Sequence, residues 1–380
     1  MNPKEQIIKL LKQCDIEVNG SRDFDIQVKD ERLYSKVLAE GSLGAGEAYM
    51  DGWWDVKALD QFFCKMFESD AVRKFYTSLP AMISIIKAKM FNMQSSSRSF
   101  QVGEKHYDIG NDIYKAMLGK SMAYSCGYWS PPLAGSCSER KKMTLDDAQF
   151  AKYDLICRKI GLKSGQKILD IGCGWGGFLK YAAENYGAKG MGITISKEQA
   201  EFARETLKGL DIEILLQDYR LLTGKFDHVI SIGMFEHVGY KNYGFFMKRV
   251  SELLNDDGLF LLHTIGTNES TASGDPWMEK YIFPNGMLPS VSQIGKSVER
   301  IFVMEDWHNF GAYYDKTLMA WFENFNNNWN FLKHNYSERF YRMWKFYLLS
   351  CAGMFRAREV GLWQIVFSKR GVKGGYNSMR

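Results

Sequence analysis

From Gly161 onward, short apolar runs rich in β-branched residues alternate with amphipathic segments, and this alternation constrains the fold more than any other feature. The pattern predicts strands at 167–171, 190–195, 212–216, 226–232 and 259–263, with helices at 178–186 and 197–208. Short buried strands separated by helices are typical of a mostly parallel, doubly wound α/β sheet. We therefore expect a Rossmann-like domain whose ligand site lies beyond the carboxyl ends of the strands.

Length and composition set wider limits. The chain has 380 residues, 46% hydrophobic and 24% charged, so it can bury a core, and wholesale disorder is excluded. No apolar run approaches the length of a membrane span, and the charged N-terminus does not resemble a secretory signal. Seven cysteines without a CxxC pair indicate reduced thiols in the cytoplasm, and neither a disulfide framework nor a metal site. The net charge of +5 gives no indication of nucleic-acid binding.

The amino-terminal part of the chain has an uneven charge distribution. Residues 1–70 hold nine Lys and Arg against fourteen Asp and Glu, whereas residues 71–105 hold six basic residues against Glu104 alone. Apolar residues recur in the basic segment at helical spacing, as in helices that lie on anionic membranes, although an ordinary packed helix explains the pattern equally well. The serine-rich run that begins at Gln94 has the composition of a linker. We predict three parts: a small, mainly helical N-terminal domain for lipid docking (1–93), a linker (94–102) and a catalytic domain (103–380).

A glycine-rich turn follows the first predicted strand, in the sequence Asp170-Ile-Gly172-Cys-Gly174-Trp-Gly-Gly. Glycines let the backbone turn tightly and approach a ligand, but such a turn fits NAD, FAD and S-adenosylmethionine alike. A NAD site needs an acidic residue at the end of the second strand, and that strand ends here without one. The acid instead precedes the glycines, at Asp170, which favours a methyltransferase.

Polar side chains also follow the later strands. The fourth strand runs into Gly-Met-Phe-Glu236-His-Val-Gly, and the fifth is predicted to end at His263. A lone buried histidine is usually a satisfied core residue, but two polar residues at adjacent strand ends favour a functional site. Upstream, the segment Tyr124-Ser-Cys126-Gly-Tyr-Trp is placed to fold over the cofactor, although Cys126 would equally suit a core as a small hydrophobe.

Together these motifs resemble those of the cyclopropane-fatty-acyl-phospholipid synthase family, which includes the mycolic acid cyclopropane synthases. The resemblance is carried by YSCGYW, LDIGCGWGG, GITISKEQ, LLQDYR, GMFEHVG, LLHTIG, YIFPNG, MEDWHNFG and CAGMFRAR. The resemblance extends across nearly the whole chain, including residues 41–54 in the N-terminal part. None of the motifs is specific alone, whereas nine in this order are. The loop at 130–144 departs from the family by being longer and more basic than expected.

The resemblance implies transfer of a methylene group from S-adenosylmethionine to a cis double bond of a phospholipid acyl chain, with bicarbonate as the base. The family's bicarbonate ligands correspond to the side chains of Cys126, Glu236, His263 and Tyr314 and to the backbone of Ile265. The cofactor contacts that we expect are Tyr124, Ser125, Asp170, Gly172, Gly174, Thr194, Ile195, Ser196, Gln199, Gln217 and Asp218. Such a substrate implies a cytoplasmic enzyme in peripheral contact with the inner face of an anionic membrane, and it leaves a homodimer open.

Two other interpretations remain. A methyltransferase for another lipid or a small molecule would need only the cofactor motifs and would leave the Glu236–His263 pair unexplained. A non-catalytic lipid-binding protein would need only the fold, and the intact motifs at the strand ends weigh against it. The aromatic residues between Trp321 and Phe340 are interpreted as parts of helices over the sheet, with most of the rings in a core.

Reversing the charge of the basic segment is expected to weaken membrane binding. Each basic residue near an anionic surface contributes about 1 kcal/mol at low salt. Replacing Arg73, Lys74, Lys87 and Lys89 by Glu should therefore greatly reduce co-sedimentation with anionic vesicles, while the circular dichroism spectrum stays that of the folded protein. Unchanged binding by the folded variant would contradict this prediction and would point to another surface, such as the basic residues 140–142.

Overall fold

The computed structural model describes residues 3–69, 110–129 and 143–380. The basic segment 71–105, the predicted linker 94–102 and most of the loop 130–144 lie outside the described residues. Among the helices that are described, none is both long and apolar enough to cross a membrane.

A seven-stranded mixed sheet forms the centre of the larger part of the molecule, in the order β5-β4-β3-β6-β7-β9-β8. Its five parallel strands are β3 (Lys167–Ile171), β4 (Lys189–Thr194), β5 (Ile212–Leu216), β6 (Phe226–Ile232) and β7 (Leu254–Thr267). The antiparallel strands β9 (Val360–Ser368) and β8 (Val303–Asn309) extend the sheet beyond β7. The doubly wound architecture is confirmed, and four of the five predicted strands have the predicted bounds to within one residue.

β7 differs from its prediction, which ended the strand at His263. The strand continues to Thr267 because its other edge pairs with β9 from Leu259 onward. Within this longer strand His263 pairs with Ile232, the last residue of β6, so it still lies level with the end of the neighbouring strand. β8 and β9 were not predicted from the sequence; β8 is mostly exposed or half-buried and, among the described strands, pairs with β9 alone.

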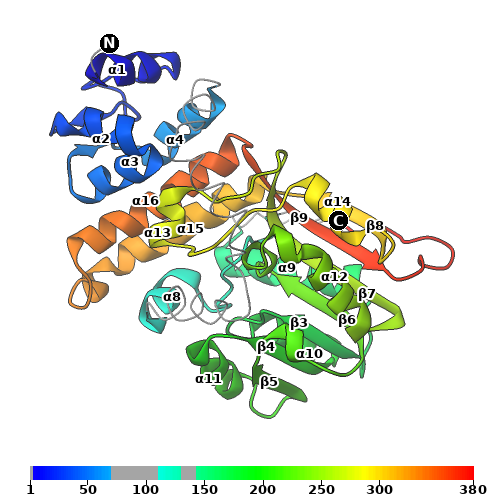
Figure 1. Cartoon of the computed structure of the whole chain (residues 1–380). Helices are drawn as coiled ribbons and strands as arrows, with labels where there is room; N and C mark the ends of the chain where they lie inside the picture. The colour runs from blue at the N-terminus through cyan, green and yellow to red at the C-terminus, as the bar shows by residue number, and fades with distance from the viewer. Residues whose placement is uncertain (1–2, 70–109, 130–142) are drawn as a thin grey trace, which may run out of the picture.

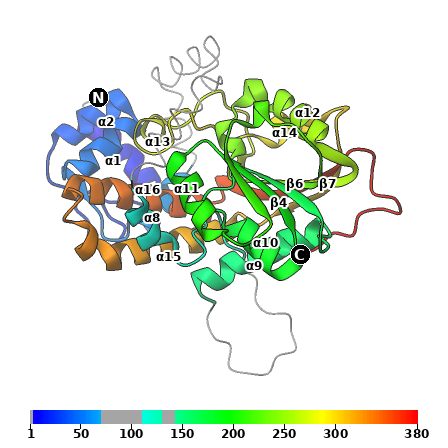
Figure 2. The same cartoon turned by 90° about the horizontal axis from the view of Figure 1, so that it is seen from below.

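Helices cover both faces of the sheet (Figure 2). One face carries α9 (Leu145–Lys159) and α10 (Gly177–Tyr186), and the other carries α12 (Tyr243–Leu253) and α14 (Val291–Val298). α11 (Lys197–Thr206) connects β4 to β5. α9 begins with a capping box, in which Thr144 Oγ1 accepts a hydrogen bond from the Asp147 N–H and Asp147 accepts one from the Thr144 N–H.

The amino-terminal helices pack against the second of two long helices near the carboxyl end of the chain (Figure 1). The first group contains α1 (Pro3–Gln13), α2 (Arg32–Glu40), α3 (Ser42–Met50) and α4 (Leu59–Glu68), together with the short pair β1 (Gln27–Val28) and β2 (Trp54–Asp55). The long helices are α15 (Ala312–Leu332) and α16 (Glu338–Arg356), which lie side by side. α8 (Asn111–Leu118) contacts α15, and α13 (Pro276–Tyr281) contacts α3. The division into domains stays a prediction.

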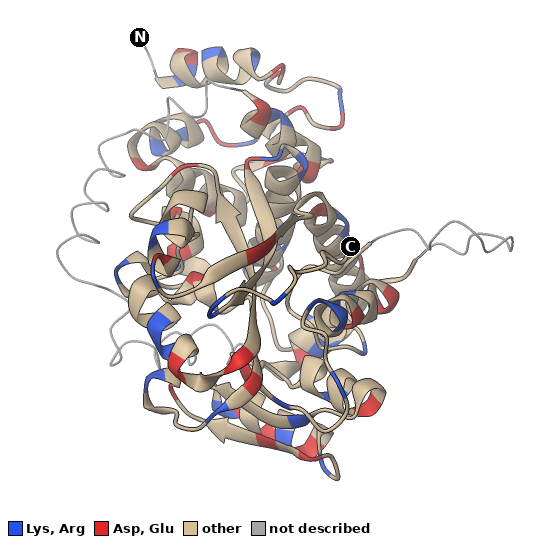
Figure 3. Ribbon diagram, turned by 90° about the vertical axis from the view of Figure 1, so that its right-hand side faces the viewer, with Lys and Arg blue, Asp and Glu red and all other residues tan. Residues whose placement is uncertain are grey.

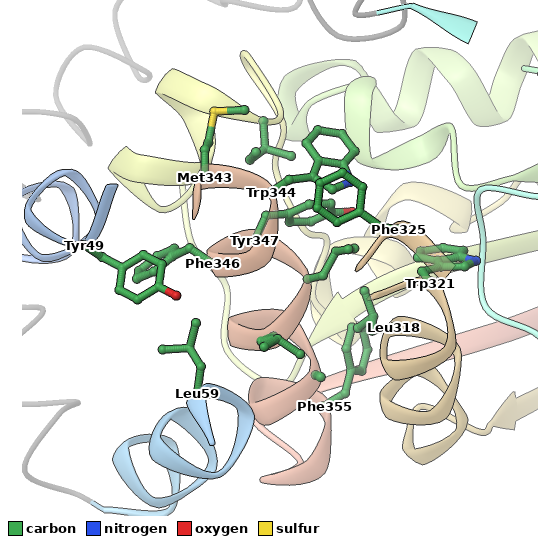
Figure 4. Packing of buried hydrophobic residues seen from close by; sticks show 14 of the residues in the cluster. Tyr49, Leu59, Leu318, Trp321, Phe325, Met343, Trp344, Phe346, Tyr347 and Phe355 are labelled. Carbon is green, nitrogen blue, oxygen red and sulfur yellow. The ribbon is translucent and has the colours of Figure 1, made fainter. Parts of the chain in front are cut away.

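One hydrophobic cluster joins these helices (Figure 4). The Phe346 ring of α16 lies 5.4 Å from that of Tyr49 in α3, while Trp321 and Phe325 of α15 are fully buried. The aromatic segment is therefore helical, as predicted. Its helices pack mainly on each other and on α3, α4 and α8, and only slightly against the sheet, which corrects the expectation that they lie over it. The ring of Phe331 is also outside any core, with 80% of its surface exposed.

α16 and α4 approach so closely at Gly353 that a side chain there would collide with α4. A Cβ at this position would lie 2.5 Å from Asp60 O and 2.8 Å from Cys64 N. Gly353→Ala is therefore expected to lower the free energy of unfolding by about 1–3 kcal/mol through overpacking, as measured by urea titration. The control is Gly295→Ala in α14, where a Cβ would meet nothing within 4 Å. It should be neutral or stabilising, since alanine favours the helix, and an equal loss in both variants would contradict the prediction.

Candidate functional site

A pocket lies at the carboxyl ends of the parallel strands, and ten of the eleven predicted cofactor contacts line it. These ten residues are Tyr124, Ser125, Asp170, Gly172, Gly174, Thr194, Ile195, Gln199, Gln217 and Asp218. Ser196 is not one of the lining residues: its Oγ accepts a hydrogen bond from the Gln199 N–H (3.3 Å) and caps α11. The pocket occupies the position where parallel sheets bind ligands.

The glycine turn after β3 gives the pocket an exposed backbone. Gly172 and Gly174 have φ angles of +83° and +55°, a region that side chains disfavour. A Cβ on Gly172 would lie 2.6 Å from the Met234 Cβ, whereas a Cβ on Gly174 would meet nothing within 4 Å. Gly174 therefore borders open space in the pocket, as is needed for a ligand that lies directly on the backbone.

Asp170 supplies a buried hydrogen-bond acceptor to the wall of this pocket. Its Oδ1 has no hydrogen-bond partner among the described residues. Burial raises the pKa of Asp170 to about 7, although the charge of Lys152 partly opposes this shift. A buried carboxylate oxygen without a donor is costly, so the pocket suits a ligand that brings its own donors. The ammonium and hydroxyl groups of S-adenosylmethionine meet this requirement.

A second polar group lies where β6 and β7 adjoin. Glu236 follows β6 in the short 3-10 helix Phe235–His237, and its Oε1 accepts a hydrogen bond from the Ile265 N–H (2.7 Å). Its Oε2 is buried without a hydrogen-bond partner among the described residues. Burial raises the pKa of Glu236 to about 7, and the bond from Ile265 partly opposes this. One carboxylate oxygen is thus fixed by the backbone, and the other is left for a ligand.

His263 faces the same region from β7, two residues before Ile265 on the same side of the strand. Burial lowers the pKa of His263 well below its ordinary value, and the charges of Lys152 and Lys159 lower it further, so the ring is neutral. Nδ1 lies 3.4 Å from Gln364 Nε2, while Nε2 has no partner among the described residues. With the amide oriented this way, Nδ1 accepts and Nε2 carries the hydrogen of the ring.

Cys126 and Tyr314 reach this region from other elements. The Cys126 thiol is fully buried, 3.9 Å from Thr317 Oγ1 of α15, and Tyr314 lies one turn earlier on the same helix. Burial raises the pKa of Tyr314 well above its ordinary value, and the charges of Cys126, Tyr124 and Glu236 raise it further. Since Glu236 and Cys126 both act electrostatically on Tyr314, these three predicted ligands lie in one neighbourhood.

This arrangement suits a small oxyanion that carries a hydroxyl group. Glu236 Oε2 is an acceptor for the hydroxyl, while His263 Nε2 and the Tyr314 hydroxyl are neutral donors. Burial raises the pKa of the Cys126 thiol as well, so the thiol stays protonated. The residues present therefore fit bicarbonate, and their role as its ligands stays a prediction.

Three buried residues that support Ser125 and Cys126 were not predicted from the sequence. Gln149 and Lys152 of α9 are fully buried, as is Thr317 of α15. A signal was present in the sequence, because Gln149 and Lys152 stand among apolar residues at the spacing of one helix face. What they contact depends on the packing of α9 and was not available from that spacing.

Comparison with known proteins identifies the family. A family model for mycolic acid cyclopropane synthetase matches residues 94–365. The chain belongs to this family. It is 50% identical over 372 residues to the cyclopropane-fatty-acyl-phospholipid synthase of Escherichia coli (strain K12), which covers 98% of this chain and 94% of that protein. As a member of the family, the chain is an S-adenosylmethionine-dependent methyltransferase, as predicted.

Solved structures of the family have the same fold. The cyclopropane synthase MmaA2 from Mycobacterium tuberculosis is 29% identical, with a TM-score of 0.65 over 71% of this chain and 98% of that one. The mycolic acid cyclopropane synthase CmaA1, complexed with SAH and CTAB, is 32% identical, with a TM-score of 0.64 and the same coverage.

Gly174→Val is expected to abolish cofactor binding, because the branched side chain would occupy the space next to the turn. We expect the dissociation constant for labelled S-adenosylmethionine, measured by equilibrium dialysis, to rise by about a hundredfold or more. Gly161→Val is the matched control, since Gly161 also has a positive φ (+61°) and open space at its Cβ but lies outside the pocket. Wild-type affinity in a folded Gly174→Val variant would contradict the assignment.

Proposed function

We propose that the protein transfers a methylene group from S-adenosylmethionine to the cis double bond of an unsaturated phospholipid acyl chain, with bicarbonate as the base. The observation that carries this proposal is the pair of buried atoms Glu236 Oε2 and His263 Nε2, neither of which has a partner among the described residues. Glu236 adjoins the pocket along the chain, since Met234 and His237 line the pocket on either side of it, and His263 pairs with Ile232, another lining residue. The identity to the Escherichia coli synthase supports the same reaction.

The reaction joins a weak nucleophile to an electrophilic carbon. When bound, S-adenosylmethionine supplies a sulfonium methyl group, and bicarbonate supplies a proton acceptor. Attack by one alkene carbon on the methyl group breaks the carbon–sulfur bond and leaves a carbocation at the other alkene carbon. Removal of a proton from the new methyl group then closes the cyclopropane ring. The protein must therefore orient the reactants closely, exclude water and hold the base beside the new methyl group.

The residues of the site suit these tasks. Glu236, held at Oε1 by the Ile265 N–H, orients a hydroxyl with Oε2, and neutral His263 donates from Nε2. Holding a separate base has a chemical advantage, because a carboxylate of the protein in direct contact would risk attacking the cation. Aromatic rings lie close by: the Tyr314 centroid is 4.5 Å from that of Phe355 and 5.9 Å from that of Trp321. Such rings stabilise a cation without forming a bond to it.

We further propose that the enzyme works at the inner, cytoplasmic surface of an anionic membrane, because its substrate chain lies in a bilayer. Support comes from the basic excess of residues 71–105, which lie outside the described residues. In the view of Figure 3, Lys and Arg are interspersed with Asp and Glu over the described ribbon. The basic segment is therefore our candidate for docking.

The product distinguishes this reaction from other methylations. Purified protein is incubated with S-adenosylmethionine and vesicles of a cis-unsaturated phospholipid, and the lipids are analysed by mass spectrometry. Cyclopropanation adds fourteen mass units and removes the double bond, so the product resists ozonolysis. An acyl chain that gains the same mass and is still cleaved by ozone would overturn cyclopropanation in favour of methyl branching, and an unmodified lipid would overturn the lipid substrate.

Glu236→Gln is expected to lower turnover by on the order of a hundredfold or more, because an amide replaces the ionised acceptor in a desolvated site. Affinity for S-adenosylmethionine should change little, since Glu236 is assigned to the base. The control is Glu213→Gln, the same substitution at an exposed residue of β5. Wild-type turnover is also measured in carbon-dioxide-free buffer, with bicarbonate then added back. Full activity of the variant, together with wild-type activity that does not depend on bicarbonate, would contradict the assignment.

A further inference from the structure

Lys152 of α9 is a fully buried lysine. It contacts Ser125, where the cofactor pocket and the predicted base site meet. Its Nζ donates hydrogen bonds to Ser125 Oγ (2.6 Å) and to Gln149 Oε1 (2.7 Å). Gln149 Nε2 in turn donates to the backbone carbonyl of Ser125 (2.8 Å). Residues of α9 therefore hold both the side chain and the backbone of Ser125.

The segment that contains Ser125 serves both the cofactor pocket and the predicted base site. Tyr124 and Ser125 line the pocket, while the next residue, Cys126, belongs to the base site. The segment has no helix or strand hydrogen bonds of its own, so its position depends on contacts with neighbouring helices. The carboxyl-terminal helices contribute several such contacts. Thr317 Oγ1 lies 3.9 Å from Cys126 Sγ and accepts a hydrogen bond from the N–H of the next residue, Gly127 (3.0 Å), and the Tyr124 and Tyr347 hydroxyls are 2.8 Å apart.

The electrostatic surroundings of Lys152 are unusual for a residue with only a packing role. Both of its hydrogen-bond partners are uncharged, and burial lowers the pKa of Lys152 to about 7, although the charges of Cys126 and Asp170 partly oppose this. Its own charge lowers the pKa values of Asp170 and His263, which belong to the two parts of the site. An apolar side chain would fill the same volume without the cost of burying a charge.

We propose that Lys152 is a positioning residue of the transferase site, which acts through Ser125 to hold the Tyr124–Cys126 segment where the cofactor pocket and the base site meet. The reaction in question rests on the proposed function, whereas the contact between Lys152 and Ser125 does not. Misplacement of this segment would shift the cofactor pocket and Cys126 relative to each other. Because near-attack geometry is sensitive to such shifts, the effect should be on kcat more than on the KM for lipid.

A double-mutant cycle tests this inference on the full chain, with unsaturated phospholipid vesicles and S-adenosylmethionine. Lys152→Met retains much of the apolar length and removes the donors, while Ser125→Ala removes the acceptor. We expect Lys152→Met to lower kcat by about a hundredfold. The double variant should be no more than about threefold worse than Lys152→Met, because both changes remove the same interaction. Losses that multiply, or a folded Lys152→Met variant with wild-type kcat, would overturn the proposal.

The matched control is Lys159→Met, which removes another fully buried lysine two turns further along α9. Lys159 Nζ pairs with Asp306 (3.2 Å), and burial is the larger cause of the low pKa of His263, so the ring stays neutral without Lys159. This variant should lose stability while its kcat stays within about threefold of wild type. If Lys152→Met fails to fold, Lys152→Leu, which also removes the donors, takes its place in the cycle, while Lys152→Gln, which retains a donor to Ser125, should keep more activity than Lys152→Leu. If the losses in kcat of the two single variants multiply in that cycle, the proposal is overturned in the same way.

The product separates failure of this inference from failure of the proposed function. Wild-type protein that forms a cyclopropane lipid but gives multiplicative losses would refute the role of Lys152 alone. Wild-type protein that makes another methylated product would refute the proposed function, and the same cycle, measured on that product, would still decide whether Lys152 acts through Ser125.

Discussion

The pairing of β6 with β7 is the contact on which the arrangement of the candidate site depends. It places His263 opposite Ile232, so the histidine lies level with the point where β6 ends and the chain turns toward Glu236. The Ile265 N–H, two residues further along β7, then bonds to Glu236 Oε1. A slip of one residue would turn His263 to the other face of the sheet and remove this relation. Backbone hydrogen bonds thus determine the position of two side chains that are far apart in sequence.

Burial determines the protonation states of the titratable residues in the candidate site. Removal from water raises the pKa values of Asp170 and Glu236 to about 7 and keeps His263 neutral. The same desolvation makes every unsatisfied polar atom costly, so Glu236 Oε2 and His263 Nε2 favour a ligand that satisfies both. A solvated site would hold the proposed bicarbonate more weakly and would expose the proposed carbocation to water.

The candidate site is enclosed by parts of the chain that lie outside the sheet. α15 contributes Tyr314 and Thr317, and α16 contributes Tyr347, which bonds to the Tyr124 hydroxyl. These two helices also form a hydrophobic cluster with α3 and α4, where the chain has its close contact at Gly353. Packing of the amino-terminal helices is therefore continuous with the wall of the site, and changes in one are expected to affect the other.

Most of the parallel sheet and the pocket could be predicted from the sequence, because both depend on short-range signals. Apolar runs of strand length, the glycines after β3 and the acid at Asp170 act locally, so their pattern indicates strand ends and a ligand turn without knowledge of the rest. Glu236 and His263 could be placed near each other because parallel strands end at the same edge. The cluster of Cys126 and Tyr314 with them followed only from the family resemblance.

Tertiary structure decided the features that depend on distant pairing. β7 passes His263 because β9, about a hundred residues later, offers it a second edge, and β8 forms only on β9. Phe331 is an aromatic residue of the same segment as Trp321 and Phe325, but its side chain is exposed where theirs are buried. Lys152 and Gln149 show only as polar residues on an apolar helix face, and their contact with Ser125 exists because α9 packs against that segment. Local sequence determines most of the parallel strands and the glycine turn, whereas the antiparallel edge of the sheet and the partners of buried polar atoms are set by the packing of elements far apart in the chain.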